Sequence, residues 1–322
     1  MPLIDLPLEQ LYTYRGRSPE PDDFSRFWTE ALAELDHHEA APVRRQADFQ
    51  TNQASCWHLT FTGIGGADVH VKELRPRGWT EGDPSPAVIM FHGYGRSSGG
   101  WLEKAAWAAE GWSVFAMDVR GQGGASTDPG GVSGWTLQGH ITRGLEDGPE
   151  QLFYRNVFLD AALLARLVCS DDTVDSSRVS TTGWSQGGAL ALVCAALEPR
   201  ISRCAPVYPF LSDYRRVWEM DLAEASYQDI RRWFRRFDPR HEREESFFHT
   251  LGYIDIQHMM PWVRANVLMG TGLMDTECPP STQFAAYNRL TSPKEVLVYP
   301  DFAHENLPGH PEAIFSFLTK GP

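Results

Sequence analysis

The sequence predicts an α/β fold in which helices cover both faces of a mostly parallel sheet. Apolar runs such as those within residues 87–95 and 112–123 are typical of buried strands, and segments with helical spacing of apolar residues separate them. Alternating strands and helices of this kind build a parallel sheet that is buried on both faces. Two long segments interrupt the alternation, at 124–149 and 210–260.

The N-terminal part, about residues 1–80, forms an extension before this alternation. Residues 21–35 place apolar side chains at helical spacing. Residues 54–63 and 67–76 follow a rough period of two, which indicates two strands. We therefore expect a helix and a hairpin ahead of the main sheet.

The main sheet is predicted from six further strands and five helices. The strands are expected within 87–95, 112–123, 178–184, 201–209, 265–272 and 294–300. The helices are expected near 101–110, 150–167, after Ser185, near 282–290 and at 312–319.

The two interruptions are interpreted as insertions into one domain that spans residues 1–322. Residues 124–149 are dense in glycine, and a loop of more than about 15 residues in a compact domain is usually functional or disordered. This segment is expected near the active site or at an oligomer contact. Residues 210–260 are aromatic and heavily charged, so they predict a helical insertion over the edge of the sheet.

Composition and sequence pattern exclude several classes of protein and several kinds of site. A net charge of −13 repels nucleic acid. The first twenty residues lack the pattern of a signal peptide, and no apolar run reaches the roughly 18 to 20 residues of a membrane span. We expect no export and no membrane partner. Five cysteines at irregular spacing suggest neither a zinc cage nor a disulfide framework.

The segment GWSQG around Ser185 fits the G-x-S-x-G pattern of a nucleophile elbow. A strand rich in β-branched residues precedes it and a helix follows, which is the context that this turn requires. Gly183 and Gly187 would remove collisions with neighbouring backbone on so sharp a turn. The alternative is that Ser185 only caps the following helix.

A serine nucleophile needs a base and a carboxylate that orients the base. Asp275 follows one predicted strand and His304 follows the next, in the chain order Ser, Asp, His. Asp301 is the weaker candidate, because three residues of separation from His304 favour a local turn. His92 is interpreted as a residue that braces its loop. The remaining candidate histidines are interpreted as surface or packing residues: His37, His38, His58, His70, His241, His249 and His258.

Two backbone amides are candidates for an oxyanion hole. Gln186 follows the nucleophile at a helix N-terminus, where the helix dipole favours negative charge. Tyr94 lies between Gly93 and Gly95, and those small residues let the backbone approach a ligand.

Three strings, in order, resemble the signature set of carbohydrate esterase family 7, the acetyl xylan esterases and cephalosporin C deacetylases of the α/β-hydrolase superfamily. They are RGQ (Arg120, Gly121 and Gln122), GWSQG around Ser185, and HE (His304 and Glu305). Residues 140–161 and 272–288 also resemble family segments, and the resemblance spans nearly the whole chain.

The resemblance implies a carboxylic ester hydrolase with an α/β-hydrolase fold. Ser185 would be the nucleophile, His304 the base, Asp275 its orienting carboxylate, and the amides of Tyr94 and Gln186 the oxyanion hole. Arg120 would either brace the active-site loops or act as a simple turn residue. The arginine-rich part of the helical insertion, around 230–245, is less familiar and has no assigned role.

The resemblance also implies acetylated carbohydrates or cephalosporins as substrates, no metal or cofactor, a cytoplasmic location and a hexamer with 124–149 at the interface. Two other readings stay open. One is a peptidase-like or dienelactone-hydrolase-like enzyme on the same fold, since fold alone does not fix the substrate. The other is a non-catalytic binding module.

Overall fold

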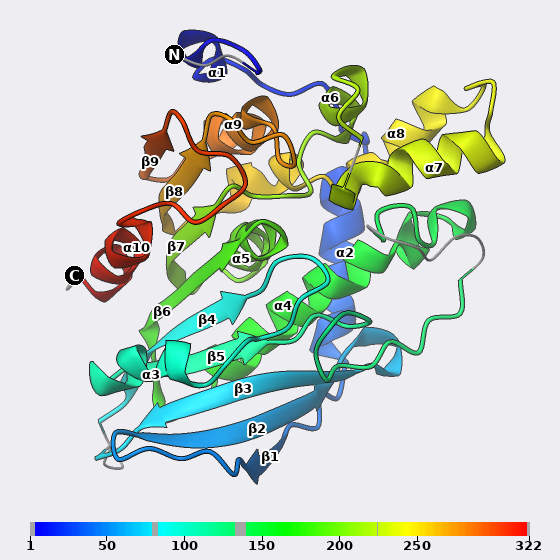
Figure 1. Ribbon diagram of the computed structural model, residues 1–322. Coiled ribbons are helices and arrows are strands. Elements are labelled where there is room, and N and C mark those ends of the chain that lie inside the picture. Colours follow the sequence, from blue (N-terminus) through cyan, green and yellow to red (C-terminus); the bar gives the residue numbers. More distant parts are fainter. Residues whose placement is uncertain (1–3, 79–82, 133–139, 224, 321–322) are drawn as a thin grey trace.

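The computed structural model describes residues 4–78, 83–132, 140–223 and 225–320. These residues form a nine-stranded sheet with the order β1-β2-β3-β5-β4-β6-β7-β8-β9. The strands from β5 to β9 in this order run parallel to one another, whereas β1, β2 and β3 pair antiparallel. The predicted mostly parallel sheet is confirmed (Figure 1).

The N-terminal extension contains the expected helix and hairpin, and one strand more. The helix is α2 (Phe24–Asp36), after a short helix α1 (Leu8–Leu11). The hairpin is β2 (Ala54–Thr62) with β3 (Asp68–Pro76). The extra strand β1 (Val43–Gln46) was not predicted, because all four of its residues are exposed and carry no apolar pattern.

The remaining predicted strands and helices all occur. The strands are β4 (Ser85–Phe91), β5 (Ser113–Met117), β6 (Val174–Trp184), β7 (Ile201–Val207), β8 (Asn266–Gly272) and β9 (Lys294–Tyr299). The helices are α3 (Leu102–Ala109), α4 (Phe153–Cys169), α5 (Gln186–Leu197), α9 (Pro280–Arg289) and α10 (His310–Thr319). Helix α4 begins later than expected, because residues Pro149–Gln151 form a separate 3-10 turn.

Side chains that alternate along the central strands enter two hydrophobic cores. In β4, Ile89 and Phe91 pack into the core that contains α2, α4 and α5. Val88, which precedes Ile89 on the opposite face of the strand, enters the second core with Trp107 of α3 and Leu318 of α10. Figure 1 shows α3 and α10 on one side of the sheet and α2, α4 and α5 on the other. Burial on both faces explains why the central strands are continuous apolar runs.

The segment between β7 and β8 is helical, as predicted. It holds α6 (Tyr214–Glu219), α7 (Gln228–Phe237) and α8 (Glu244–Gly252), with 3-10 turns at Ala225–Tyr227 and Ile256–Trp262. The arginine-rich helix α7 buries Ile230, Trp233 and Phe234 and leaves Arg235 and Arg236 exposed. Its aromatic residues thus serve as packing, and its arginines face outward.

The glycine-rich segment expected at 124–149 is described in part. Residues 124–132 form a loop, and Leu145–Asp147 is a 3-10 turn. Residues 133–139 of this expected interface lie outside the described residues.

All five cysteines are buried and free of disulfides. Within the described ranges, no helix has the length and apolar character needed to cross a bilayer.

Candidate active site

Ser185 lies on a sharp turn between β6 and α5, with φ 57° and ψ −118°. A non-glycine residue with positive φ is strained, and such strain clusters at functional sites. The side chain makes no capping hydrogen bond to the helix, although the residue occupies the N-cap position. The geometry therefore favours an exposed hydroxyl over the capping alternative.

The neighbouring glycines are required by close backbone contacts. A Cβ atom on Gly187 would lie 2.1 Å from the carbonyl oxygen of Phe91. One on Gly183 would lie 2.4 Å from the backbone of Gly187. Any larger residue at these two positions would push α5 away from β4 and β6.

Asp275 and His304 meet across two loops that follow β8 and β9. The Nδ1 atom of His304 lies 2.8 Å from Oδ2 of Asp275. Asp275 is fully buried, and its Oδ1 accepts hydrogen bonds from the amides of Glu277 and Cys278. These amides fix the carboxylate so that its other oxygen faces the imidazole. Asp301, the weaker candidate, is exposed.

Burial lowers the pKa of His304, but the hydrogen bond and charge of Asp275 outweigh it, and Glu277 adds to the same effect. The net shift is upward. The Tyr208 ring packs on the imidazole with centroids 4.3 Å apart. His304 is thus held on one edge by a carboxylate and on one face by an aromatic ring.

Ser185 and His304, both within the described part of the chain, make no direct hydrogen bond in this structure. The side chain of Ser185 lies close enough to Cys278 to lower the pKa of its thiol. Burial raises the pKa of that thiol, and the charges of Asp275 and Glu277 raise it further, so it stays protonated. In serine enzymes such hydrogen bonds are often long before substrate binds.

Asp275, Cys278 and His304 offer ligand atoms that lie within 4.8 Å of one another. Oδ2 of Asp275 and Nδ1 of His304 already bond each other, and Cys278 keeps its proton. A cysteine binds zinc as a thiolate. The contacts therefore fit a proton relay better than a metal site.

The loop that carries Tyr94 lies against the elbow. A Cβ atom on Gly93 would lie 4.0 Å from Cβ of Ser185, so the loop touches the turn. Gly95 has φ 69°, a conformation that favours glycine. Gln186 opens α5, and the amides of a first helical turn point out of the helix. Tyr94 and Gln186 thus flank the serine from two elements.

The two glutamines predicted near this site bond each other. Nε2 of Gln122 donates to Oε1 of Gln186 over 2.7 Å, and Oε1 of Gln122 accepts from the amide of Gly95 over 2.9 Å. Tyr154 also donates to Oε1 of Gln186, over 3.0 Å. Gln122 therefore connects the loop of Tyr94 to the start of α5.

Arg120 forms a buried two-point ion pair with Asp160 of α4. Its Nε and Nη2 lie 2.6 Å from the two carboxylate oxygens, and Nη2 also donates to the carbonyl of Ile64. Gly121, next to it, has φ 63°. These contacts join the segment after β5 to α4 and to the N-terminal extension, whereas a role for Arg120 in bracing the active-site loops stays a prediction.

His92 braces its loop through both ring nitrogens. The amide of Val119 donates to Nε2 over 2.9 Å, so Nδ1 is the protonated nitrogen and donates to the carbonyl of Gly93. Burial lowers the pKa of His92. Glu305 accepts from the amide of Ala303 and has an exposed side chain, so it acts in the local turn.

Four residues at the site were not found from the sequence. Oε2 of Glu277 lies 3.8 Å from Nε2 of His304, and its side chain is half exposed. His140 bonds the hydroxyl of Tyr94 through Nδ1 over 3.1 Å. The others are Cys278 and Tyr208. Of these four residues, only Glu277 and Cys278 could have been suspected from the sequence, because they follow Asp275 closely.

Comparisons with known proteins point to one family. Residues 1–321 match the family model described as acetyl xylan esterase. The acetyl esterase Axe7A of Xylanibacter ruminicola is 26% identical over an alignment of 306 residues that covers 90% of this chain and 66% of that protein. The chain thus spans about two thirds of the length of this relative.

Two solved structures are similar over nearly their whole length. Acetyl xylan esterase 1 from Thermoanaerobacterium sp. JW/SL YS485 superposes with a TM-score of 0.95 at 48% identity, with 98% of each chain covered. An acetyl xylan esterase from Paenibacillus sp. R4 gives a TM-score of 0.92 at 38% identity, covering 97% of this chain and 99% of that one. These likenesses confirm the α/β-hydrolase fold.

Proposed function

The chain belongs to the acetyl xylan esterase family and is a carboxylic ester hydrolase, and from that premise we propose that it removes acetyl groups from acetylated xylo-oligosaccharides and from small acetyl esters such as cephalosporin C. The observation that carries the proposal is the hydrogen-bonded pair of Asp275 and His304 beside the elbow serine. The similar proteins are acetyl esterases and acetyl xylan esterases, which supports an acetyl ester as the substrate class.

The proposed reaction is a two-step acyl transfer. Oγ of Ser185 attacks the acetyl carbonyl carbon while Nε2 of His304 takes the hydroxyl proton. The tetrahedral intermediate collapses, and His304 returns that proton to the departing alcohol oxygen. Water then attacks the acetyl-enzyme by the same route, which releases acetate and restores the serine hydroxyl.

The residues around the reacting atoms fit these steps. Asp275 stabilises the imidazolium that forms on His304, in line with the upward pKa shift. The amides of Tyr94 and Gln186 would donate to the oxyanion, a contribution of about 3 to 4 kcal/mol for each donor. Gln122 would hold the two donors at a fixed separation.

The same proposal covers the assembly and location that the family resemblance implies. We place the segment 124–149 at an interface in a homo-oligomer, a hexamer by resemblance, and we expect a cytoplasmic enzyme. Size-exclusion chromatography with light scattering measures the subunit number. A monomer under all conditions would contradict the interface.

A chain-length series of p-nitrophenyl esters tests the substrate class, run beside acetylated xylo-oligosaccharides and cephalosporin C. We expect the acetyl ester to be hydrolysed fastest and esters with longer acyl chains to be hydrolysed more slowly. Preference for butyrate or longer chains would contradict deacetylation.

The alternative of a peptidase-like enzyme predicts cleavage of aminoacyl anilides. The non-catalytic alternative predicts no turnover of any ester. The positions of Ser185, Asp275 and His304 do not favour a non-catalytic module. They also do not identify the leaving group, so the anilide assay uses the same enzyme preparation as the ester assay.

A further inference from the structure

A cavity of about 510 Å³ opens at the end of the sheet opposite to the active site. It lies beside Ser85, where β4 begins, whereas β4 ends next to the loop of His92 and Gly93. At about 3.3 Å per residue, the strand separates the two sites by roughly 20 Å. The volume of the cavity is in the range of small-molecule sites, about 300 to 1,000 Å³.

Strand register explains why polar side chains line this cavity. Trp57 of β2 lies opposite Glu73 of β3, and Ser55 lies opposite Arg75. Directly paired residues project from the same face of a sheet. Earlier on the same face of β3, Val71 enters the hydrophobic core with α4. Helix α4 ends at Cys169, and the strand face beyond it carries charged residues.

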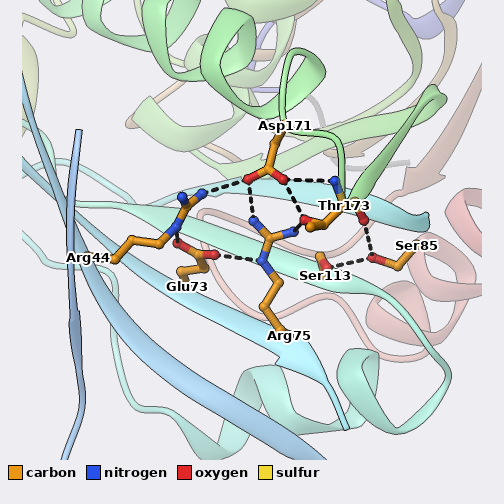
Figure 2. Close-up of polar contacts among 7 residues, drawn as sticks. All are labelled: Arg44, Glu73, Arg75, Ser85, Ser113, Asp171 and Thr173. Carbon is orange, nitrogen blue, oxygen red and sulfur yellow. Dashed lines mark hydrogen bonds and ion pairs between the residues drawn. The ribbon is translucent and has the colours of Figure 1, made fainter. Parts of the chain in front are cut away.

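Four charged groups form a closed network at the cavity (Figure 2). Arg44 donates from Nε to Glu73 over 2.8 Å and from Nη2 to Asp171 over 2.6 Å. Arg75 donates to the same two carboxylates over 2.6 and 2.7 Å. The Glu73 side chain is only 2% exposed. Both carboxylates therefore accept hydrogen bonds from both guanidinium groups.

Asp171 is fixed further by its own loop. Its Oδ1 accepts from the amide and the hydroxyl of Thr173. Burial raises the pKa of Asp171, but hydrogen bonds from Thr173 and the charges of Arg75 and Arg44 outweigh it and give a net downward shift. The network is thus a rigid, charge-neutral wall.

Arg77 adds a cation that this network does not neutralise. Its Nε contacts the carbonyl of Ala54 over 3.4 Å, and among the described residues it makes no ion pair. The lining groups Arg44, Arg75, Arg77, Glu73 and Asp171 therefore sum to one positive charge. This local excess stands out in a chain whose net charge is −13.

The half-buried ring of Trp57 supplies a flat apolar surface in the same cavity. Aromatic rings in ligand sites combine such a surface with a few polar groups that fix orientation. Guanidinium groups bind carboxylates and phosphates through paired hydrogen bonds. Together these groups match a ligand with one anionic group and one apolar face.

We propose that this cavity binds an anionic monosaccharide, whose carboxylate or phosphate pairs with Arg77 and the exposed edge of Arg44 and whose ring lies on Trp57. The site is separate from the proposed acetyl ester site and does not depend on it. If the network has only a structural role, it joins the N-terminal extension to the loop before β6. That role would need Arg44 and Arg75 but not Arg77. A substitution of Arg77 therefore distinguishes a ligand-binding role of the cavity from a purely structural role.

Isothermal titration calorimetry of the full chain tests the site with three probes: D-glucuronate, D-glucose 6-phosphate and uncharged D-glucose. We expect at least one anion to bind and glucose to bind at least tenfold more weakly. Tighter binding of glucuronate or of the phosphate identifies which anionic group the site prefers. No binding of either anion at millimolar concentration, or equal binding of glucose, would overturn the proposal.

Three variants then locate the binding. R77A is expected to weaken anion binding at least tenfold, and R77K to restore part of it. The matched control is R45A, which removes the same charge from β1, where Arg45 lines a different cavity. Esterase activity should be unchanged in all three. Binding that is unaffected by R77A, or weakened equally by R45A, would overturn the assignment.

Discussion

The side-chain amides of Gln122 and Gln186 bond each other, and Gln122 also accepts from the amide of Gly95. Gln122, in the segment that follows β5, thus links the loop after β4 to the first turn of α5. Both of those segments carry the amides that we assign to the oxyanion hole.

Gln122→Ala should reduce kcat for p-nitrophenyl acetate by roughly tenfold, less than the hundredfold or more that loss of a donor itself costs. The reason is that two donors would lose their fixed separation. Steady-state kinetics measure the effect. Gln50→Ala, which removes a glutamine that bonds the turn between β1 and β2, is the control and should change kcat little.

Glu277→Gln should move the acidic limb of the kcat/KM profile to lower pH, by roughly 0.2 to 0.7 unit. His304 acts as a base only when neutral, and the charge of Glu277 raises its pKa. Removal of that charge lowers the pKa, so activity persists to lower pH. Glu305→Gln, whose carboxylate bonds the amide of Ala303, is the comparison and should shift the limb less. A limb that moves upward in Glu277→Gln would contradict this electrostatic role.

Gly187→Ala should destabilise the protein by at least about 3 kcal/mol or prevent folding. Its Cβ would lie 2.1 Å from the carbonyl oxygen of Phe91, and backbone cannot yield cheaply there. Thermal unfolding measures the loss. Gly100→Ala is the matched control, because a Cβ there would make only an ordinary contact, 3.8 Å from Oε1 of Glu103. Equal melting temperatures for the two variants would refute the steric account.

Arg120→Leu should destabilise the fold by about 3 to 5 kcal/mol, because it leaves the Asp160 carboxyl buried without its cation. The double variant Arg120→Leu with Asp160→Leu should recover much of that loss, since no buried charge remains. Urea denaturation of both variants gives the two values. A double variant that is less stable than Arg120→Leu would count against this explanation.

The central strands could be predicted because burial on both faces leaves continuous apolar runs in β4 and β5. Strand β1 could not, because all four residues of its sequence VRRQ are exposed and show no apolar alternation. Asp275 and His304 could be predicted as loop residues that follow β8 and β9, since parallel strands end at one edge of a sheet.

Side-chain direction within those loops could not be predicted from spacing. Glu277 and Cys278 turn toward His304 and Ser185 because the amides of both residues bond Asp275, which depends on the folded turn. The cavity beside Arg77 was also missed, because its lining comes from six separate segments that meet only in the folded sheet.

Acetate release by Ser185→Ala, measured beside Cys278→Ala, tests the proposed nucleophile most directly. Ser185 lies close enough to Cys278 to lower the pKa of its thiol, and serine and cysteine are both residue types that attack esters. We predict that Ser185→Ala loses at least about 10⁴-fold in kcat and that Cys278→Ala keeps most of its activity. Acetate release by Ser185→Ala within tenfold of the unaltered protein would contradict the account.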